Sequence, residues 1–134
     1  MTTQYSTTVR DARLDVVETT IGVSPTLEVF TGAQPANCAA ADSGTLLASM
    51  TLPVDWMAAA AGGAKALSGT WQDLLANNSG TAGHYRIKAG VTCHMQGSAG
   101  QAGGGADMQF DNATFVAGQG PITITAFTLT EGNP

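Results

Sequence analysis

From residue 26 onward, apolar residues recur at every second position in short runs separated by Gly, Asn and Pro. This alternation is typical of strands with one buried and one exposed face. Helices instead need apolar positions three and four residues apart. About eight such runs predict a mainly β protein, a jelly-roll-like antiparallel β-sandwich with a short N-terminal α-helix.

The expected strands differ in clarity. Residues 45–52 alternate apolar with polar side chains, and Pro53 closes the run. In residues 121–130 the apolar positions change phase near Thr125 and Ala126, which predicts a β-bulge and one long strand serving two sheets. The other expected strands are residues 27–31, 64–71, 83–88, 91–97, 107–111 and 113–118. The Gly-rich residues 97–105 are expected to form a mobile loop or a segment ordered by a neighbour.

Residues 8–21 have the spacing of an amphipathic helix. Thr8 with Asp11 three residues later is a variant of the capping box, and Gly22 can adopt the left-handed conformation that ends a helix. Five of the 15 charged residues lie in this segment, so its outer face is expected to be polar and solvated. The 134 residues are expected to form a single domain, with an N-terminal arm and helix in 1–25 and the sandwich in 26–134.

Charged residues make up only 11% of the chain, against about 25% in an ordinary soluble domain. A weakly charged surface is poorly protected against association and favours a protein that works packed against other subunits. With five Lys and Arg and a net charge of −5, direct nucleic-acid binding is not expected. No apolar run approaches the roughly 20 residues that span a bilayer, and the polar start predicts no export signal, so no membrane contact is expected.

No motif predicts an enzyme. The glycine spacings of phosphate-binding loops and of a nucleophilic serine turn are absent from the sequence. Cys38 and Cys93 are too few for a four-cysteine zinc site. Without an export signal, reduced thiols are the default expectation, with Cys93 a small core residue. A bridge would need Cα atoms within about 7 Å, which the spacing leaves open.

One pair of histidines and one pair of aspartates have spacings that could serve metal binding or proton transfer. His84 and His94 flank a predicted turn and could face each other across a hairpin, but no acidic residue lies nearby in the sequence, which favours structural histidines. Asp107 and Asp111 share a strand face, yet Ca²⁺ needs about six oxygens or more. No metal and no cofactor are therefore expected.

Three aromatic residues, Trp56, Trp71 and Tyr85, could form a flat platform that stacks on sugars. In a chain with only 6% aromatic residues, tryptophans are more often anchors of a core or an interface. We therefore expect anchoring roles, and a carbohydrate-binding, receptor-contacting module remains an alternative function.

Several segments carry a resemblance to a known family. They are TTVRDARLD at 7–15, TGAQPANC at 31–38, LPVDWM at 52–57, SGTW at 68–71, GTAGHYRI at 80–87 and the closing strand ITITAFTL at 122–129. In this order they resemble small virion proteins of tailed bacteriophages over nearly the whole chain. Within that group the chain is most similar to the capsid cement, or decoration, proteins of short-tailed phages.

The resemblance implies a non-enzymatic structural protein on the exterior of the virion capsid, assembled in the bacterial cytoplasm with reduced cysteines. Its implied partners are the major capsid protein of an HK97-type shell and a second copy in a homodimer. There it would reinforce contacts between capsomers. A head-to-tail or tail accessory protein of the virion is the other alternative.

Two segments are candidates for contact with the shell or a second copy. Both are amphipathic and lie outside the clearest strands. The residues concerned are Tyr5, Val9, Arg10, Arg13 and Leu14 in the arm and helix, and Trp56 and Met57 in a loop.

Overall fold

The computed structural model describes residues 2–132, of which α1 (Thr7–Ile21) is the helix. The strands are β1 (Thr26–Phe30), β2 (Leu46–Thr51), β3 (Ala64–Ala66), β4 (Gln72–Asp73), β5 (Gly80–Thr81), β6 (His84–Ala89), β7 (Thr92–Gln101), β8 (Met108–Phe110), β9 (Thr114–Phe115) and β10 (Ile122–Thr130). The chain is 39% strand and 11% helix. This confirms the predicted mainly β sandwich of about eight strands with an N-terminal helix.

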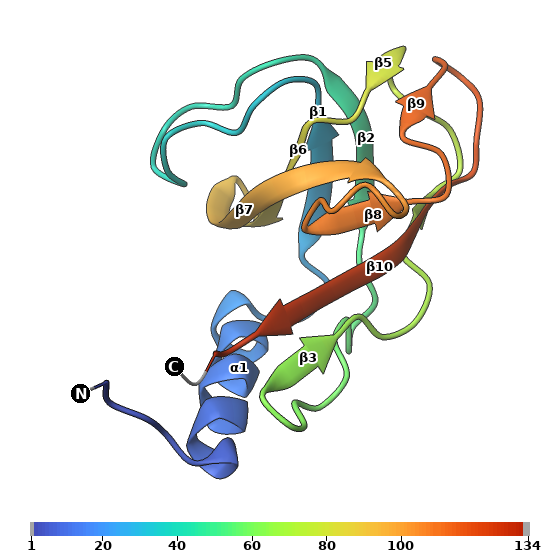
Figure 1. The fold of residues 1–134 in the computed structure, drawn as a ribbon. Coiled ribbons are helices and arrows are strands. Elements are labelled where there is room, and N and C mark those ends of the chain that lie inside the picture. The colour runs from blue at the N-terminus through green and yellow to red at the C-terminus, as the bar shows by residue number, and fades with distance from the viewer. Residues whose placement is uncertain (1, 133–134) are drawn as a thin grey trace.

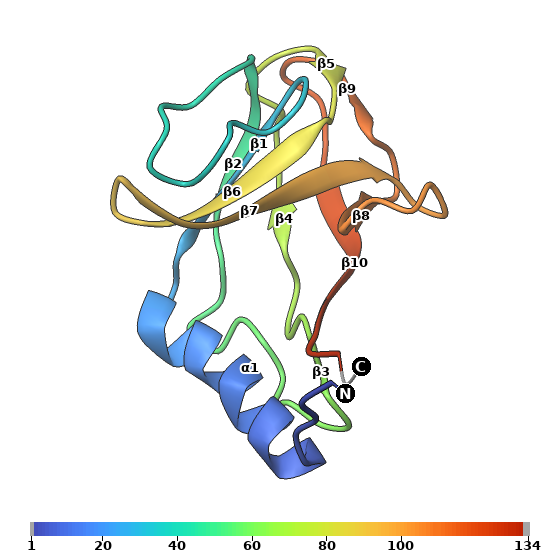
Figure 2. The same ribbon diagram turned by 60° about the vertical axis from the view of Figure 1, so that its left-hand side comes forward.

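The main sheet has the strand order β2-β1-β6-β7-β8-β10-β3, and β4 pairs with β10 beside this path. β5 and β9 form a separate two-stranded sheet. The named pairs are antiparallel apart from β7 and β8, which run parallel. α1 lies across one end of the strands, beside β3 and the end of β10 (Figures 1 and 2).

β10 connects the parts of the sheet. It pairs with β4 at Ile122, then with β8, and finally with β3 at Thr128 to Thr130. The register with β8 shifts between Ile124 and Ala126. This shift is the predicted bulge, and it lets one long strand pair with different partners along its length.

The aromatic side chains lie in the core. The Trp71 ring lies 5.9 Å from the Trp56 ring and 5.6 Å from the Phe127 ring, and Tyr85 meets Phe127 edge-on. The indole N–H of Trp71 donates to the carbonyl oxygens of Trp56 and Ser68, each at 3.1 Å. The rings of Trp56, Trp71 and Tyr85 are 0%, 1% and 3% exposed, so they act as core anchors and form no sugar platform.

One expected strand is shorter than predicted. The strand expected over 64–71 ends at Ala66, and Trp71 lies in the core. Residues 97–105 were expected to be a mobile loop or a segment ordered by a neighbour, and 97–101 belong to β7, where they pair with β6 and β8, so the mobile-loop alternative is wrong for this part. Small residues are needed at this place, since a Cβ at Gly97 would collide with the Tyr85 ring.

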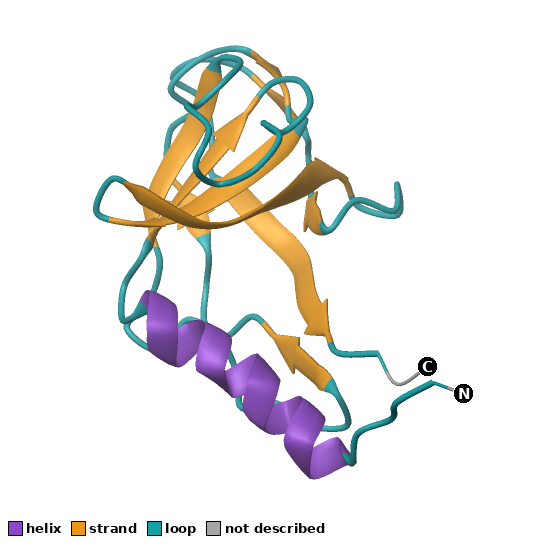
Figure 3. Cartoon of the chain, turned by 90° about the vertical axis from the view of Figure 1, so that its left-hand side faces the viewer, coloured by secondary structure: helices purple, strands orange, loops and turns teal. Residues whose placement is uncertain are grey.

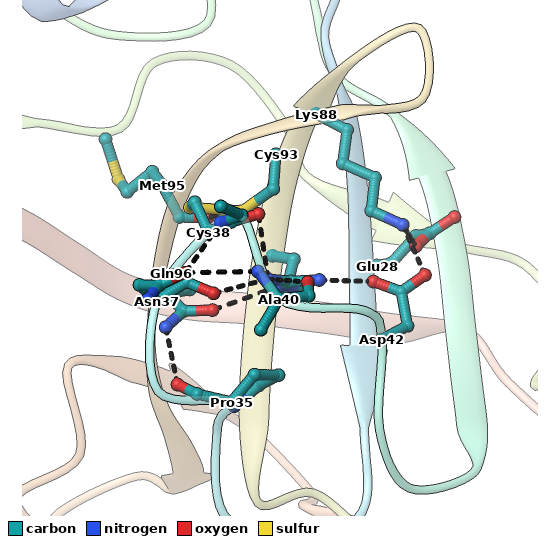
Figure 4. The surroundings of a disulfide bond; sticks show 12 residues. Glu28, Pro35, Asn37, Cys38, Ala40, Asp42, Lys88, Cys93, Met95 and Gln96 are labelled. Carbon is teal, nitrogen blue, oxygen red and sulfur yellow. Dashed lines mark hydrogen bonds and ion pairs between the residues drawn. A yellow bond between two sulfur atoms is a disulfide. The ribbon is translucent and has the colours of Figure 1, made fainter.

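A disulfide joins Cys38, in the loop after β1, to Cys93 on β7, with a Cα–Cα distance of 5.2 Å (Figure 4). The expectations of reduced thiols and of a Cys93 within the core are therefore wrong, and both residues are only partly buried. The path of the loop, not the spacing in the sequence, brings the two Cα atoms within bridging distance.

Arg86 also holds this loop in place, from the centre of β6. Its side chain is 2% exposed. It donates to the carbonyl oxygens of Asn37, Cys38 and Ala40 and to the carboxylate of Asp42 (Figure 4). An irregular loop has no strand partner for its carbonyl groups, and the guanidinium supplies donors in their place.

Two glycines of this loop allow a matched test. Gly44 and Gly32 both have a positive φ, 75° and 77°. A Cβ at Gly44 would overlap the carbonyl oxygen of Thr31, whereas a Cβ at Gly32 would meet no heavy atom within 4 Å.

We expect Gly32→Ala to lower the free energy of unfolding by about 1–2 kcal/mol through backbone strain. Gly44→Ala should lower the free energy of unfolding by about 1–3 kcal/mol more than Gly32→Ala, because its Cβ would also overlap the carbonyl oxygen of Thr31. Urea denaturation measures both, and equal losses would contradict the prediction.

Candidate functional site

α1 contacts the sandwich through carboxylates. Each of three side chains accepts a backbone N–H from the segment before β3: Asp11 from Gly63 (2.7 Å), Asp15 from Ala60 (3.0 Å) and Glu18 from Met57 (3.2 Å). The expectation that the charges of this helix form a solvated outer face is therefore wrong for these carboxylates.

The spacing of the three carboxylates explains this orientation. Asp11, Asp15 and Glu18 are four and three residues apart, so they lie on one face of the helix. Residues 58–63 make few strand contacts, and their N–H groups need acceptors. The helix supplies these acceptors. An acidic stripe at helical spacing is the signal in the sequence that could have predicted this face.

Lys65 on β3 completes the contact. Its side chain is 2% exposed, and its ammonium lies 2.7 Å from Asp15 and 2.9 Å from Glu18. It also donates to the carbonyl oxygen of Ala58 at 2.9 Å. Burial disfavours the ammonium, but the hydrogen bonds to Asp15 and Glu18 outweigh it and raise the pKa of Lys65. The charge of Lys65 is thus neutralised within the contact.

The ends of α1 are set by local side chains. Ser6, in an extended conformation, accepts the N–H of Val9 at 3.3 Å, so the cap is Ser6 and the predicted Thr8 cap is wrong. Gly22 ends the helix at the predicted position, but with φ 94° and ψ −175° and not in the left-handed helical conformation, and its N–H donates to the carbonyl oxygen of Glu18. The carbonyl oxygen of Gly22 accepts the indole N–H of Trp56 at 3.0 Å.

The opposite side of α1 is apolar and exposed. Val9 is 41% exposed and Val16 is 59% exposed, and Ala12 between them is also exposed. We call Val9, Ala12 and Val16 the outer face of α1. Their spacing of three and four residues places them along one line on the helix. Figure 3 shows that the helix lies at the periphery of the molecule.

Arg13 and Tyr5 flank the outer face. The Arg13 guanidinium lies 5.1 Å from the centre of the Tyr5 ring and 2.8 Å from the Glu131 carboxylate. Tyr5 is 44% exposed, and the Arg13 side chain is 51% exposed. The structure therefore brings Tyr5, Val9 and Arg13, three of the predicted contact residues, to one exposed surface.

The other predicted contact residues are not available to a partner. Leu14, Trp56 and Met57 are 4%, 0% and 1% exposed, so the prediction of a contact role is wrong for them. Arg10 is half-buried and donates to the carbonyl oxygen of Glu131 and to the Thr7 hydroxyl. The chain bends at Val54 and Asp55, and Trp56 and Met57 then donate hydrogen bonds to Gly22 and Glu18 at the C-terminal end of α1.

The histidines do not face each other. His84 is fully buried, stacks on Phe30 at 5.2 Å, and its Nδ1 lies 2.9 Å from the carbonyl oxygen of Gly32. His94 is exposed on β7, and His84 pairs instead with Ser98. Within residues 2–132, no three His, Cys, Asp or Glu side chains are grouped as metal ligands. In the same range no helix has the length and apolarity to cross a membrane.

The pKa values of Tyr85 and Lys65 predict that the free energy of unfolding falls at alkaline pH. Burial, with a smaller effect of the Asp107 charge, raises the pKa of the Tyr85 phenol above its ordinary value of 10.0. The phenolate therefore forms more readily in the unfolded chain, so stability is present below about pH 10 and is lost above it. The pKa of Lys65 is also raised, so its stabilising contribution is likewise lost at alkaline pH.

We expect the free energy of unfolding, measured by urea denaturation, to fall between about pH 9 and about pH 11. Tyr85→Phe should make this fall less steep because the titrating phenol is removed. Tyr5→Phe is the matched control, since it removes the same hydroxyl group from a side chain that is 44% exposed. An unchanged profile in Tyr85→Phe would contradict the assignment.

Comparisons with protein-family models, with curated proteins and with solved structures found no match for this chain.

Proposed function

We propose that this protein is a non-catalytic structural protein of a tailed bacteriophage virion. It binds the outside of an HK97-type shell of the major capsid protein and reinforces contacts between capsomers. The observation that carries the proposal is the orientation of α1, whose carboxylates bind the sandwich while Val9 and Val16 face outward. The resemblance of the sequence to capsid cement proteins supports the same partner.

The orientation of α1 favours a protein partner on physical grounds. A surface helix normally turns its apolar stripe to its own core and its charges to water. Here α1 buries Leu14 and Ile21 and also binds the sandwich through carboxylates, and a second apolar set, Val9 and Val16, stays exposed for another surface. Covering one valine contributes about 1.5 kcal/mol, which is modest for a single contact.

Repetition makes modest contacts effective on a shell. Opening the shell would require many bound copies to detach, so their binding free energies stabilise the closed particle together. The helix is held rigidly for such a contact, because its carboxylates form ion pairs with Lys65 and accept backbone N–H groups of the sandwich.

The test is co-sedimentation of the purified protein with heads of its own phage from which it has been stripped, with unrelated capsids as the control. We expect saturable binding at a copy number comparable with that of the major capsid protein, and a higher temperature of head disruption. Binding at a few copies per particle, or none, would overturn the cement function and favour the tail accessory alternative.

A matched pair of variants locates the contact. Val16→Ser should weaken head binding about tenfold, because the hydroxyl replaces apolar contact area. Val91→Ser is the control, since Val91 is 95% exposed at the tip of the β6–β7 hairpin, on another element. Equal affinities of the two variants would contradict the role of the outer face of α1.

A homodimer, also implied by the resemblance, remains part of the proposal and is measured by sedimentation equilibrium. The carbohydrate-binding alternative receives no support from the aromatic residues that suggested it. Trp56, Trp71 and Tyr85 lie in the core, where a sugar cannot stack on them.

A further inference from the structure

A groove of about 600 Å³ runs between the C-terminal half of α1 and the segment that follows β2. We call it the α1 groove. The lining residues that matter for binding are Asp15, Glu18, Val23, Val54, Asp55 and Lys65.

Two valines of the α1 groove are exposed. Val23 follows the turn at Gly22 and is 71% exposed, and Val54 follows Pro53 and is 67% exposed. Neither reaches the core, because Trp56 and Met57 fill the space beneath α1. The groove therefore offers apolar contact area that the described chain does not cover.

The charge of the α1 groove is negative. Asp15, Glu18 and Asp55 supply three carboxylates, and Lys65 supplies one ammonium, which leaves a net charge of −2. The Lys65 ammonium is 2% exposed and already bound to Asp15 and Glu18, so it presents little positive charge to a ligand. The last turn of α1 contains no basic residue, and its carbonyl ends add negative partial charge.

We propose that the α1 groove binds a surface segment of the partner protein in which an aliphatic or aromatic side chain adjoins a lysine or arginine. The apolar side chain would lie against Val23 and Val54, and the cation would lie near Asp55 and the half-exposed carboxylate of Asp15. The inference rests on the proposed function in naming that partner as the major capsid protein.

A second copy of this chain fits the groove poorly. Lys65, Arg86 and Lys88 are buried at 2%, 2% and 7% exposure, and Arg10 and Arg13 are both bound to Glu131. Among the cations of the described chain, Arg13 lies exposed beside an exposed aromatic ring, that of Tyr5, and its guanidinium is already paired with the Glu131 carboxylate at 2.8 Å. The charge of the groove favours a different protein over self-association.

The test uses two synthetic pentapeptides, acetyl-Gly-Leu-Arg-Leu-Gly-amide and the same peptide with neutral citrulline in place of arginine. In ¹⁵N–¹H NMR titrations of the full chain, we expect the arginine peptide to shift amide signals of residues 18–23 and 54–59. The citrulline peptide should bind about tenfold more weakly, and added salt should reduce this difference. Shifts located elsewhere, or equal affinities of the two peptides, would overturn the proposal.

Variants separate the apolar and ionic contributions. Val23→Ser with Val54→Ser should weaken binding of both peptides, whereas Asp55→Asn should weaken only the arginine peptide. Val91→Ser is the control for an exposed valine elsewhere. If Asp55→Asn weakens both peptides equally, the ionic part of the proposal is wrong.

Head binding then distinguishes the two proposals. If Val23→Ser with Val54→Ser binds stripped heads like the unaltered protein, the α1 groove is not the contact and the cement function stands. If the arginine peptide binds the groove but the unaltered protein does not bind heads, the cement function fails and the groove chemistry stands.

Discussion

Loss of the Cys38–Cys93 disulfide is expected to lower the free energy of unfolding by about 4 kcal/mol, with the folded structure retained. The two cysteines are 55 residues apart in the sequence. In the chain-entropy description, a crosslink over a loop of this length mainly restricts the unfolded chain, and its removal restores that freedom. In the folded state Arg86 still holds the loop through three carbonyl groups and Asp42.

Urea denaturation with and without reductant measures this loss. Cys38→Ser with Cys93→Ser should show the same reduced stability in both conditions, and it serves as the control for other effects of the reductant. Because Arg86 remains in place, the far-UV spectrum of the reduced protein should match that of the oxidised protein. Equal stability of the oxidised and reduced proteins would contradict the prediction.

Trp71→Ala is expected to lower the free energy of unfolding by about 3–5 kcal/mol. The Trp71 side chain is 1% exposed and lies between the Trp56 and Phe127 rings. Truncation would remove this contact area and leave a cavity where β10 meets the segment beneath α1. The carbonyl oxygen of Ser68 would also lose the indole donor, whereas that of Trp56 would keep the N–H of Ser68 at 2.9 Å.

Trp71→Phe separates these contributions. It keeps an aromatic ring but removes the indole N–H, so a loss of about 1–3 kcal/mol is expected from the lost hydrogen bonds to Trp56 and Ser68 and from the smaller ring. Near-UV circular dichroism and urea denaturation measure both variants. A loss below about 1 kcal/mol for Trp71→Ala would show that the surrounding core closes over the gap.

The alternation of side chains was sufficient to predict most of the sheet. The phase change in residues 121–130 correctly located the bulge near Thr125, because a bulge reverses which side chains face inward. β4 and β5, each only two residues long, were missed because two residues show no period. The order of the strands depends on pairings between distant segments, which local patterns do not encode.

The candidate surface was predicted only in part. Tyr5, Val9 and Arg13 are exposed as expected, but Trp56 and Met57 are core residues beneath α1. Apolar side chains in a loop have the same pattern whether the loop folds over the core or away from it. The inward turn of the α1 carboxylates depends on N–H groups 39 to 52 residues away.

The position of β10 has a consequence for the order in which the chain folds. β1, β2, β6 and β7 pair with one another in the sheet and precede β10 in the chain. β3 and β4 take β10 as their strand partner, and Arg10 and Arg13 of α1 bind Glu131 just beyond it. During translation, β1, β2, β6 and β7 can therefore pair early, whereas β3 and β4 lack their strand partner until β10 has been synthesised. Their completion requires closure of loops of about 50 residues or more, so final folding is delayed until β10 has left the ribosome.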